Sequence, residues 1–106
     1  MVESRYQARL IKKLKNIFEG CVILKNDESY MQGIPDLVIF FGGRWAMLEV
    51  KDSADSPFQP NQEYYIEKFN KMWYASVIYP ENEREVIDAL QFALSPAEPS
   101  ARISER

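Results

Sequence analysis

Apolar side chains recur in the first segment of the chain with the period of a helix. Between residues 3 and 18 they lie at positions i, i+1, i+4, i+7 and i+8, counted from Leu10, which is the apolar stripe of an amphipathic helix. A second helical pattern runs over residues 60–72 and begins with Pro60, which suits the first helical position. A third helical pattern covers residues 82–94.

Short apolar runs lie between these predicted helices, and they are rich in residues that favour strands. They cover residues 21–25, 37–41, 44–51 and 73–79. The Gly42–Gly43 pair between the second and third runs is a hairpin turn signal. The predicted order is therefore α-β-β-β-α-β-α. A hairpin combined with a crossover helix predicts an α/β fold with a mixed β-sheet flanked by helices.

The length of 106 residues suits one domain. We expect this domain in residues 1–94, followed by a disordered tail over residues 95–106, where proline, serine and charged residues dominate. No apolar run reaches the roughly 18 residues that span a bilayer, and the first residues do not form a signal peptide. The single cysteine, Cys21, fits a reducing compartment. We therefore predict a cytoplasmic protein without a membrane partner.

The composition excludes several kinds of chemistry. The chain has no histidine and one cysteine, so Ser-His-Asp and Cys-His triads are absent. Zinc sites that need histidine or several cysteines are excluded as well, as are iron–sulfur clusters. Any reaction would have to use carboxylates, lysine, hydroxyl groups or a cation that is bound by oxygen atoms, such as Mg²⁺.

Charge is unevenly distributed along the chain. The net charge is −3, but residues 1–25 hold six basic and two acidic side chains. Four of these basic residues lie opposite the apolar stripe of the first helix or beside it. This face is either a solvated helix surface or a surface that docks on a polyanion. The four residues are Arg5, Arg9, Lys12 and Lys13.

The predicted hairpin brings three charged side chains together. With a two-residue turn at Gly42–Gly43, Asp36 faces Glu49 across the two strands, and directly opposed side chains lie on the same face of a sheet. Side chains alternate along a strand, so Lys51 points to the same side as Glu49. Asp36, Glu49 and Lys51 are therefore expected on one face.

Two opposed carboxylates repel each other and need compensation. A shared proton, Lys51 or a divalent cation such as Mg²⁺ could supply it. The alternative is a solvated cross-strand cluster in which Lys51 forms a salt bridge. The prediction depends on the hairpin register, because a slip of one residue would place the two carboxylates on opposite faces.

Two further polar residues lie at inward positions of predicted helices. Glu3 precedes Leu10 by seven residues and falls on the apolar stripe, where a carboxylate needs a partner. Its alternative place is the exposed first turn, where it favours the helix dipole. Gln62 precedes Ile66 by four residues. It could orient a water molecule or hydrogen-bond a strand end, or it could simply cap its helix.

The order of these residues resembles the VRR-NUC family of the PD-(D/E)XK nuclease superfamily. The similar set comprises Glu3, the segment Gly33-Ile34-Pro35-Asp36, the segment Glu49-Val50-Lys51 and Gln62. The resemblance covers roughly residues 2–90 and implies a restriction-endonuclease-like fold and a metal-dependent nuclease. The chain departs from the family pattern after residue 72, where an expected glycine is missing. Trp73 and Tyr74 stand there, and we expect them in the core, with a subunit interface as the alternative.

The resemblance also implies a role for each site residue. Lys51 would position or activate the attacking water and stabilise the charge that develops on the phosphate, and Gln62 would help to position Lys51 or the water. The cation, Mg²⁺ or Mn²⁺, would support phosphodiester hydrolysis. Its implied ligands are Asp36, Glu49, the backbone carbonyl of Val50 and, through water, Glu3.

Small members of this family resemble Holliday junction resolvases that act as homodimers, and they are common in phages and bacteria. The resemblance therefore implies a structure-specific DNA endonuclease that acts on branched DNA, with the four-way junction as the favoured substrate. The basic residues of the first helix would contact DNA phosphates, which position a protein without reading sequence. The alternatives are a flap or nicking nuclease of the same fold, a catalytically silent nucleic-acid-binding module and a plain interaction domain.

Overall fold

The computed structural model describes residues 4–95. Its element order confirms the order predicted from the sequence. No helix within the described part is long and apolar enough to span a membrane. The elements are α1 (Arg5–Ile17), β1 (Val22–Lys25), β2 (Leu37–Phe41), β3 (Arg44–Val50), α2 (Gln62–Met72), β4 (Ala75–Ile78), the 3₁₀ helix η1 (Pro80–Asn82) and α3 (Glu83–Ala93).

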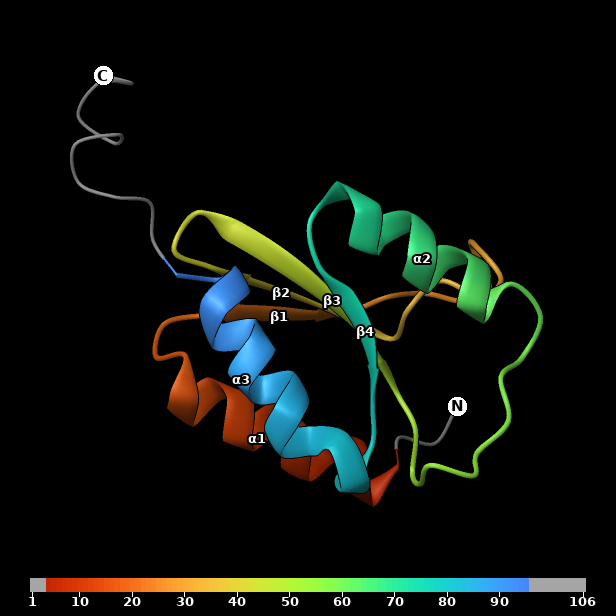
Figure 1. The fold of residues 1–106 in the computed structure, drawn as a ribbon, viewed down its shortest axis with the longest axis horizontal. Coiled ribbons are helices and arrows are strands. Elements are labelled where there is room, and N and C mark those ends of the chain that lie inside the picture. The colour runs from red at the N-terminus through yellow and green to blue at the C-terminus, as the bar shows by residue number, and fades with distance from the viewer. Residues whose placement is uncertain (1–3, 96–106) are drawn as a thin grey trace.

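The four strands form one sheet in the order β1-β2-β3-β4. The first three strands are antiparallel, and β4 runs parallel to β3 after the crossover through α2. The sheet is therefore mixed, as expected. Helices α1 and α3 cover one face of the sheet, and α2 lies on the other (Figure 1).

The main core lies between the sheet and the helix pair α1 and α3. Leu10 and Leu14 of α1 and Leu90 of α3 are almost completely buried, and they belong to one cluster with Ile39 and Leu48 of the sheet. Burying a leucine side chain contributes about 1.5–3 kcal/mol. The spacing of the apolar residues in the first and last helices thus produces the packed layer that was expected from the sequence.

The turn at Gly42–Gly43 sets the register of the hairpin. Both residues have positive φ angles, 63° and 80°, as a two-residue type I′ turn requires. The ladder runs from Phe41 opposite Arg44 to Leu37 opposite Leu48, which is the predicted register. Leu48 points into the core, so the next residue, Glu49, lies on the face that α2 covers.

Two boundaries differ from the sequence prediction. Helix α2 begins at Gln62 and not at Pro60, because Asn61 adopts a left-handed conformation with φ of 71°. Strand β4 begins at Ala75, and Trp73 caps the end of α2. Expecting Trp73 in the core was wrong: it is 45% exposed, because its indole N–H donates to the carbonyl of Ala93 (2.9 Å) at the molecular edge. Tyr74 does pack against the core.

Part of the outer sheet face carries exposed apolar side chains. Val22 and Leu24 of β1 and Phe40 of β2 are each about half exposed. Val22 pairs directly with Phe40, so these side chains share a face. It is the face of α2, because Trp45, the partner of Phe40 in β3, packs against Phe69 of that helix. Helix α2 packs mainly on β3 and β4 and leaves these three side chains exposed.

A polar link joins the two helices of the core layer. The Tyr6 hydroxyl donates a hydrogen bond of 2.8 Å to Glu83 Oε1, and Lys13 forms an ion pair with Glu83 Oε2. Burial alone would raise the pKa of Glu83, but the hydrogen bonds from Lys13 and Tyr6 lower it overall. The ionised carboxylate therefore stabilises the contact between α1 and α3.

Replacing Glu83 with glutamine is expected to lower the free energy of unfolding at pH 7 by about 1–2 kcal/mol. Because the pKa of Glu83 is lower in the folded state, this stabilisation is present above the ordinary pKa of 4.5 and disappears as the pH falls through the folded value. Urea unfolding should thus show a smaller loss of stability on acidification in Glu83→Gln than in the wild type. Glu67→Gln is the control, since the Glu67–Lys71 pair is fully exposed to solvent screening.

Candidate active site

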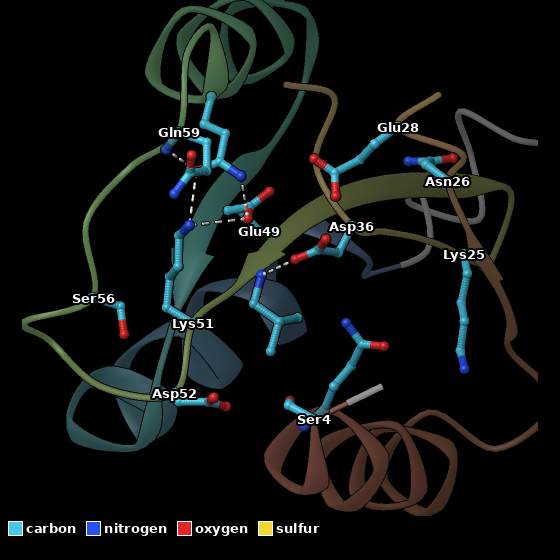
Figure 2. Close-up of a pocket in the computed structure, with 13 residues that line it drawn as sticks. Ser4, Lys25, Asn26, Glu28, Asp36, Glu49, Lys51, Asp52, Ser56 and Gln59 are labelled. Carbon is cyan, nitrogen blue, oxygen red and sulfur yellow. Dashed lines mark hydrogen bonds and ion pairs between the residues drawn. The ribbon is translucent and has the colours of Figure 1, made fainter. Parts of the chain in front are cut away.

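A cleft of about 470 Å³ opens at one end of the sheet. Helix α1 begins there, β1 and β3 end there, and α2 begins there. Figure 2 shows Asp36, Glu49 and Lys51 in the middle of this cleft, with Asn26 and Glu28 on one side and Ser56 and Gln59 on the other. The lining residues are Ser4, Gln7, Lys25, Asn26, Glu28, Asp36, Glu49, Val50, Lys51, Asp52, Ser56, Gln59 and Gln62.

Asp36 lies one residue before the paired part of β2 and is held from both neighbouring strands. Its Oδ2 atom accepts a hydrogen bond of 2.8 Å from the backbone N–H of Val50. Its backbone carbonyl accepts another of 2.8 Å from Asn26, and the side chain of Asn26 donates to the carbonyl of Pro35. The carboxylate is therefore fixed at the end of the hairpin and faces the Glu49–Lys51 segment.

Glu49 is the most deeply buried acidic side chain among the described residues, with 2% of its surface exposed. Its Oε2 atom accepts a hydrogen bond of 2.9 Å from Gln62 and lies 3.5 Å from Lys51 Nζ. Its Oε1 atom is buried and has no hydrogen-bond partner. Burial is the main cause that raises the pKa of Glu49 to about 8, and the negative charge of Asp36 adds to the shift. Lys51 partly opposes it.

Gln62 connects the catalytic candidates on β3 with the start of α2. It is 3% exposed, and its Oε1 atom accepts hydrogen bonds of 2.7 Å from Lys51 Nζ and from the backbone N–H of Gln59. Its amide nitrogen donates to Glu49. A single glutamine thereby orients the lysine and the carboxylate, and it does more than cap its own helix.

Gly33 explains why the loop before Asp36 can approach α2 so closely. Its φ angle is +91°, and a Cβ atom at this position would lie 2.6 Å from Asn61 Cβ and 2.8 Å from the carbonyl oxygen of Pro60. Such distances are shorter than any real contact, and two of the three nearest atoms belong to the backbone. The glycine therefore lets the segment that carries Asp36 rest against the residues that lead into Gln62.

Two solved structures are similar to the chain. One is a "VRR_NUC domain protein", with a TM-score of 0.58, 18% sequence identity and coverage of 92% of this chain and 94% of that one. The other is a "VRR_NUC domain", with a TM-score of 0.56, 25% identity and coverage of 72% and 85%. The chain has the VRR-NUC fold. These neighbours support the family assignment made from the sequence and a nuclease-type domain. No family model and no curated protein matches the sequence.

The VRR-NUC fold brings together four of the residues expected from the sequence, namely Asp36, Glu49, Lys51 and Gln62. Val50, the fifth, also lines the cleft. Glu3 lies outside the described residues, as does the expected tail after Ser95. The residue after Glu3, Ser4, caps α1 by accepting a hydrogen bond of 2.9 Å from the backbone N–H of Gln7.

The basic residues expected to contact DNA lie on the surface of α1, and none of them lines the cleft. Lys13 pairs with Glu83 of α3, and the guanidinium of Arg9 lies 6.0 Å from the centre of the Tyr6 ring. Arg5 and Lys12 are exposed. Helix α1 thus presents positive charge near the cleft, which is lined by its cap, Ser4, and by Gln7 of its first turn.

Sequence reasoning missed most of the polar rim of the cleft. Asn26 could have been found from the register, because it follows Lys25, the partner of Leu37 in β1, and therefore lies beside Asp36. Of the other missed residues, Lys25 ends β1, and the rest are in loops or at the start of α1, where no periodicity gives their direction. They are Ser4, Gln7, Lys25, Glu28, Asp52, Ser56 and Gln59.

The donor set of the VRR-NUC cleft fits a hard divalent cation. Within residues 4–95, no group of three or more histidine, cysteine, aspartate or glutamate side chains could hold a metal ion. Two carboxylates and a backbone carbonyl are nevertheless the oxygen donors that Mg²⁺ accepts together with water. The buried, unpartnered Oε1 atom of Glu49 is a free acceptor at this place. Burial and the neighbouring Asp36 carboxylate raise its pKa, and a cation bound between the two carboxylates would offset both effects.

Proposed function

We propose that the chain is a divalent-cation-dependent DNA endonuclease and that the cleft is its active site. One observation carries the proposal: Glu49 is a buried carboxylate whose Oε1 atom has no partner, and it lies beside Asp36 and within 3.5 Å of Lys51 Nζ. A binding module gains nothing from burying a carboxylate next to another one, because both desolvation and repulsion cost free energy. A hydrolase that uses a cation needs this arrangement.

The residues at the end of the hairpin would hold the cation. Asp36, Glu49 and the carbonyl of Val50 supply oxygen donors, and Glu3 is proposed to act through water. When bound, Mg²⁺ or Mn²⁺ would polarise the phosphate and lower the pKa of a bound water. The backbone N–H of Val50 already fixes Asp36 Oδ2, so this carboxylate needs little reorganisation to bind.

Lys51 would act on the reacting groups, and Gln62 would hold Lys51 in position. The Lys51 ammonium can donate hydrogen bonds to the attacking water and to the phosphate oxygens, where negative charge develops during hydrolysis. Gln62 is a positioning residue, since its Oε1 atom holds Lys51 Nζ at 2.7 Å. Its own position is fixed by the backbone of Gln59.

We further propose branched DNA, with the four-way junction favoured, as the substrate and a homodimer as the active form. Two copies would supply two active sites for symmetric cuts. Exposed Val22, Leu24 and Phe40 on the outer sheet face support an assembly that covers them. Arg5, Arg9, Lys12 and Lys13 would contact phosphates, which requires no recognition of sequence.

The deciding experiment incubates the protein with a labelled four-way junction, a flap and a linear duplex of matched sequence. Each is tested with Mg²⁺, with Mn²⁺ and with EDTA. We expect cleavage of the junction in the presence of either cation and none with EDTA. Asp36→Ala should lose at least 100-fold in rate, because a cation ligand is removed, whereas Lys71→Ala on the outer side of α2 should cleave like the wild type.

The other candidate functions are distinguished by the same panel. Cleavage of the flap or the duplex in preference to the junction would indicate a flap or nicking nuclease of the same fold. Binding of the junction without cleavage under both cations would indicate a silent nucleic-acid-binding module. Undiminished cleavage by Asp36→Ala would overturn the proposed site.

A further inference from the structure

Phe58 is an exposed aromatic residue at the rim of the cleft, and the proposed hydrolysis gives it no task. It is 39% exposed. Lys51 Nζ lies 5.5 Å from the centre of its ring. Its neighbours in the loop between β3 and α2, Ser56 and Gln59, both line the cleft. An apolar ring is therefore placed next to the lysine that is proposed to contact the scissile phosphate.

The segment that carries Phe58 is stiff, although it contains no helix or strand. Pro57 and Pro60 flank it and restrict both their own φ angles and the residues before them. The backbone N–H of Gln59 donates a hydrogen bond of 2.7 Å to the buried Gln62. On the other side, the backbone N–H of Ser56 donates to the carbonyl of Ser53 (3.1 Å). The backbone that carries the ring is thus held in place, so a ligand would have to order only the side chain.

The proposed phosphate site beside this ring indicates which kind of ligand the ring could bind. An exposed aromatic ring next to a site for phosphate is the arrangement that binds a nucleobase by stacking, and every base offers a face for it. A base inside a duplex already has both faces covered by its neighbours. Only an unpaired and unstacked base can turn a free face to a protein ring.

We propose that Phe58 is a stacking platform for an unpaired nucleobase next to the scissile phosphate. Among the DNA substrates of the proposed nuclease, those with an unpaired nucleotide at the cleavage position should then bind most tightly. This inference rests on the proposed nuclease function and narrows its substrate class. Lys51 holds the phosphate side of the same nucleotide, and Phe58 holds the base side.

The test compares kinetics on two substrates that differ only in pairing. One is a continuous duplex, and the other is the same sequence with a flap that leaves one nucleotide unpaired at the branch. Phe58→Ala should raise KM for the flap about 10-fold, within the range for loss of one base–aromatic stack, and leave KM for the duplex unchanged. Phe58→Tyr should keep the wild-type values. Phe92→Ala is the matched control, since Phe92 is an exposed phenylalanine of α3.

A second readout does not depend on cleavage. The unpaired nucleotide is replaced by 2-aminopurine, whose fluorescence is quenched by stacking. The flap is bound to Lys51→Met in EDTA, so that it is not cleaved during the measurement. We expect quenching that is lost in the double variant Lys51→Met/Phe58→Ala. An equal rise of KM on flap and duplex would mean that Phe58 only supports Lys51, and this would overturn the proposal. Unchanged KM and quenching in the Phe58→Ala variants would overturn it as well. If the wild type cleaves no DNA, the nuclease function fails, whereas the quenching still decides whether Phe58 stacks on a base.

Discussion

Lys51→Met is expected to lower the rate of cation-dependent DNA cleavage about 10²–10³-fold, the usual loss when one group that stabilises developing negative charge is removed. Methionine keeps the apolar stem and removes the ammonium group. The ammonium donates to Gln62 Oε1 at 2.7 Å and is the only lysine nitrogen among the described residues that forms an ion pair with Glu49.

The fold should survive this substitution. Gln62 Oε1 keeps its hydrogen bond from the backbone of Gln59, and Glu49 Oε2 keeps the one from Gln62, so few polar atoms lose their last partner. Initial rates on the labelled junction, together with the urea midpoint, check both statements. A rate within threefold of the wild type, with the fold intact, would remove Lys51 from the mechanism.

Gly33→Ala is expected to lower the free energy of unfolding by about 2–5 kcal/mol and to impair catalysis. One part of the cost is the positive φ angle of +91°, which is unfavourable by roughly 1–2 kcal/mol for a residue with a Cβ atom. The other is overlap of the new methyl group with Asn61 and Pro60 at distances of 2.6 and 2.8 Å, and such overpacking costs about 1–3 kcal/mol. Relief of the overlap would shift the start of α2, and with it Gln62.

Gly20→Ala separates the two contributions. Gly20 has nearly the same φ angle, +90°, but nothing lies within 4 Å of the added Cβ atom. Urea unfolding of both variants should therefore show a larger loss of stability for Gly33→Ala, and only this variant should lose cleavage activity. Equal losses in the two variants would show that the approach of the loop to α2 has no energetic consequence.

The site on the hairpin could be predicted because its geometry is local. A two-residue turn fixes which residues of β2 and β3 face each other, and alternation along β3 fixes the side of Glu49 and Lys51. The inward position of Gln62 followed from its spacing to Ile66. None of these predictions required knowledge of how distant parts of the chain meet.

The sequence was less informative where tertiary contacts decide the outcome. Pro60 is a favourable first residue for a helix, yet Asn61, which lies against Gly33, adopts a left-handed conformation, so α2 begins at Gln62. Trp73 has a large apolar surface, but a hydrogen bond to the end of α3 and the guanidinium of Arg44, 4.8 Å from its ring centre, hold it at the surface. The burial of Glu49 could not be derived from its neighbours in the sequence.

The Gly42–Gly43 turn lies at the far end of the hairpin from the cleft, about 20 Å away along β3 at the usual rise per strand residue. It nevertheless determines which side chains of β3 reach the cleft. A shift of one residue in the pairing of β3 with β2 would exchange the two faces of the returning strand, so that Val50 would replace Glu49 and Lys51 on the α2 side. Any change at the turn that shifts this pairing should therefore abolish activity as an active-site mutation does, although it alters no residue that lines the cleft.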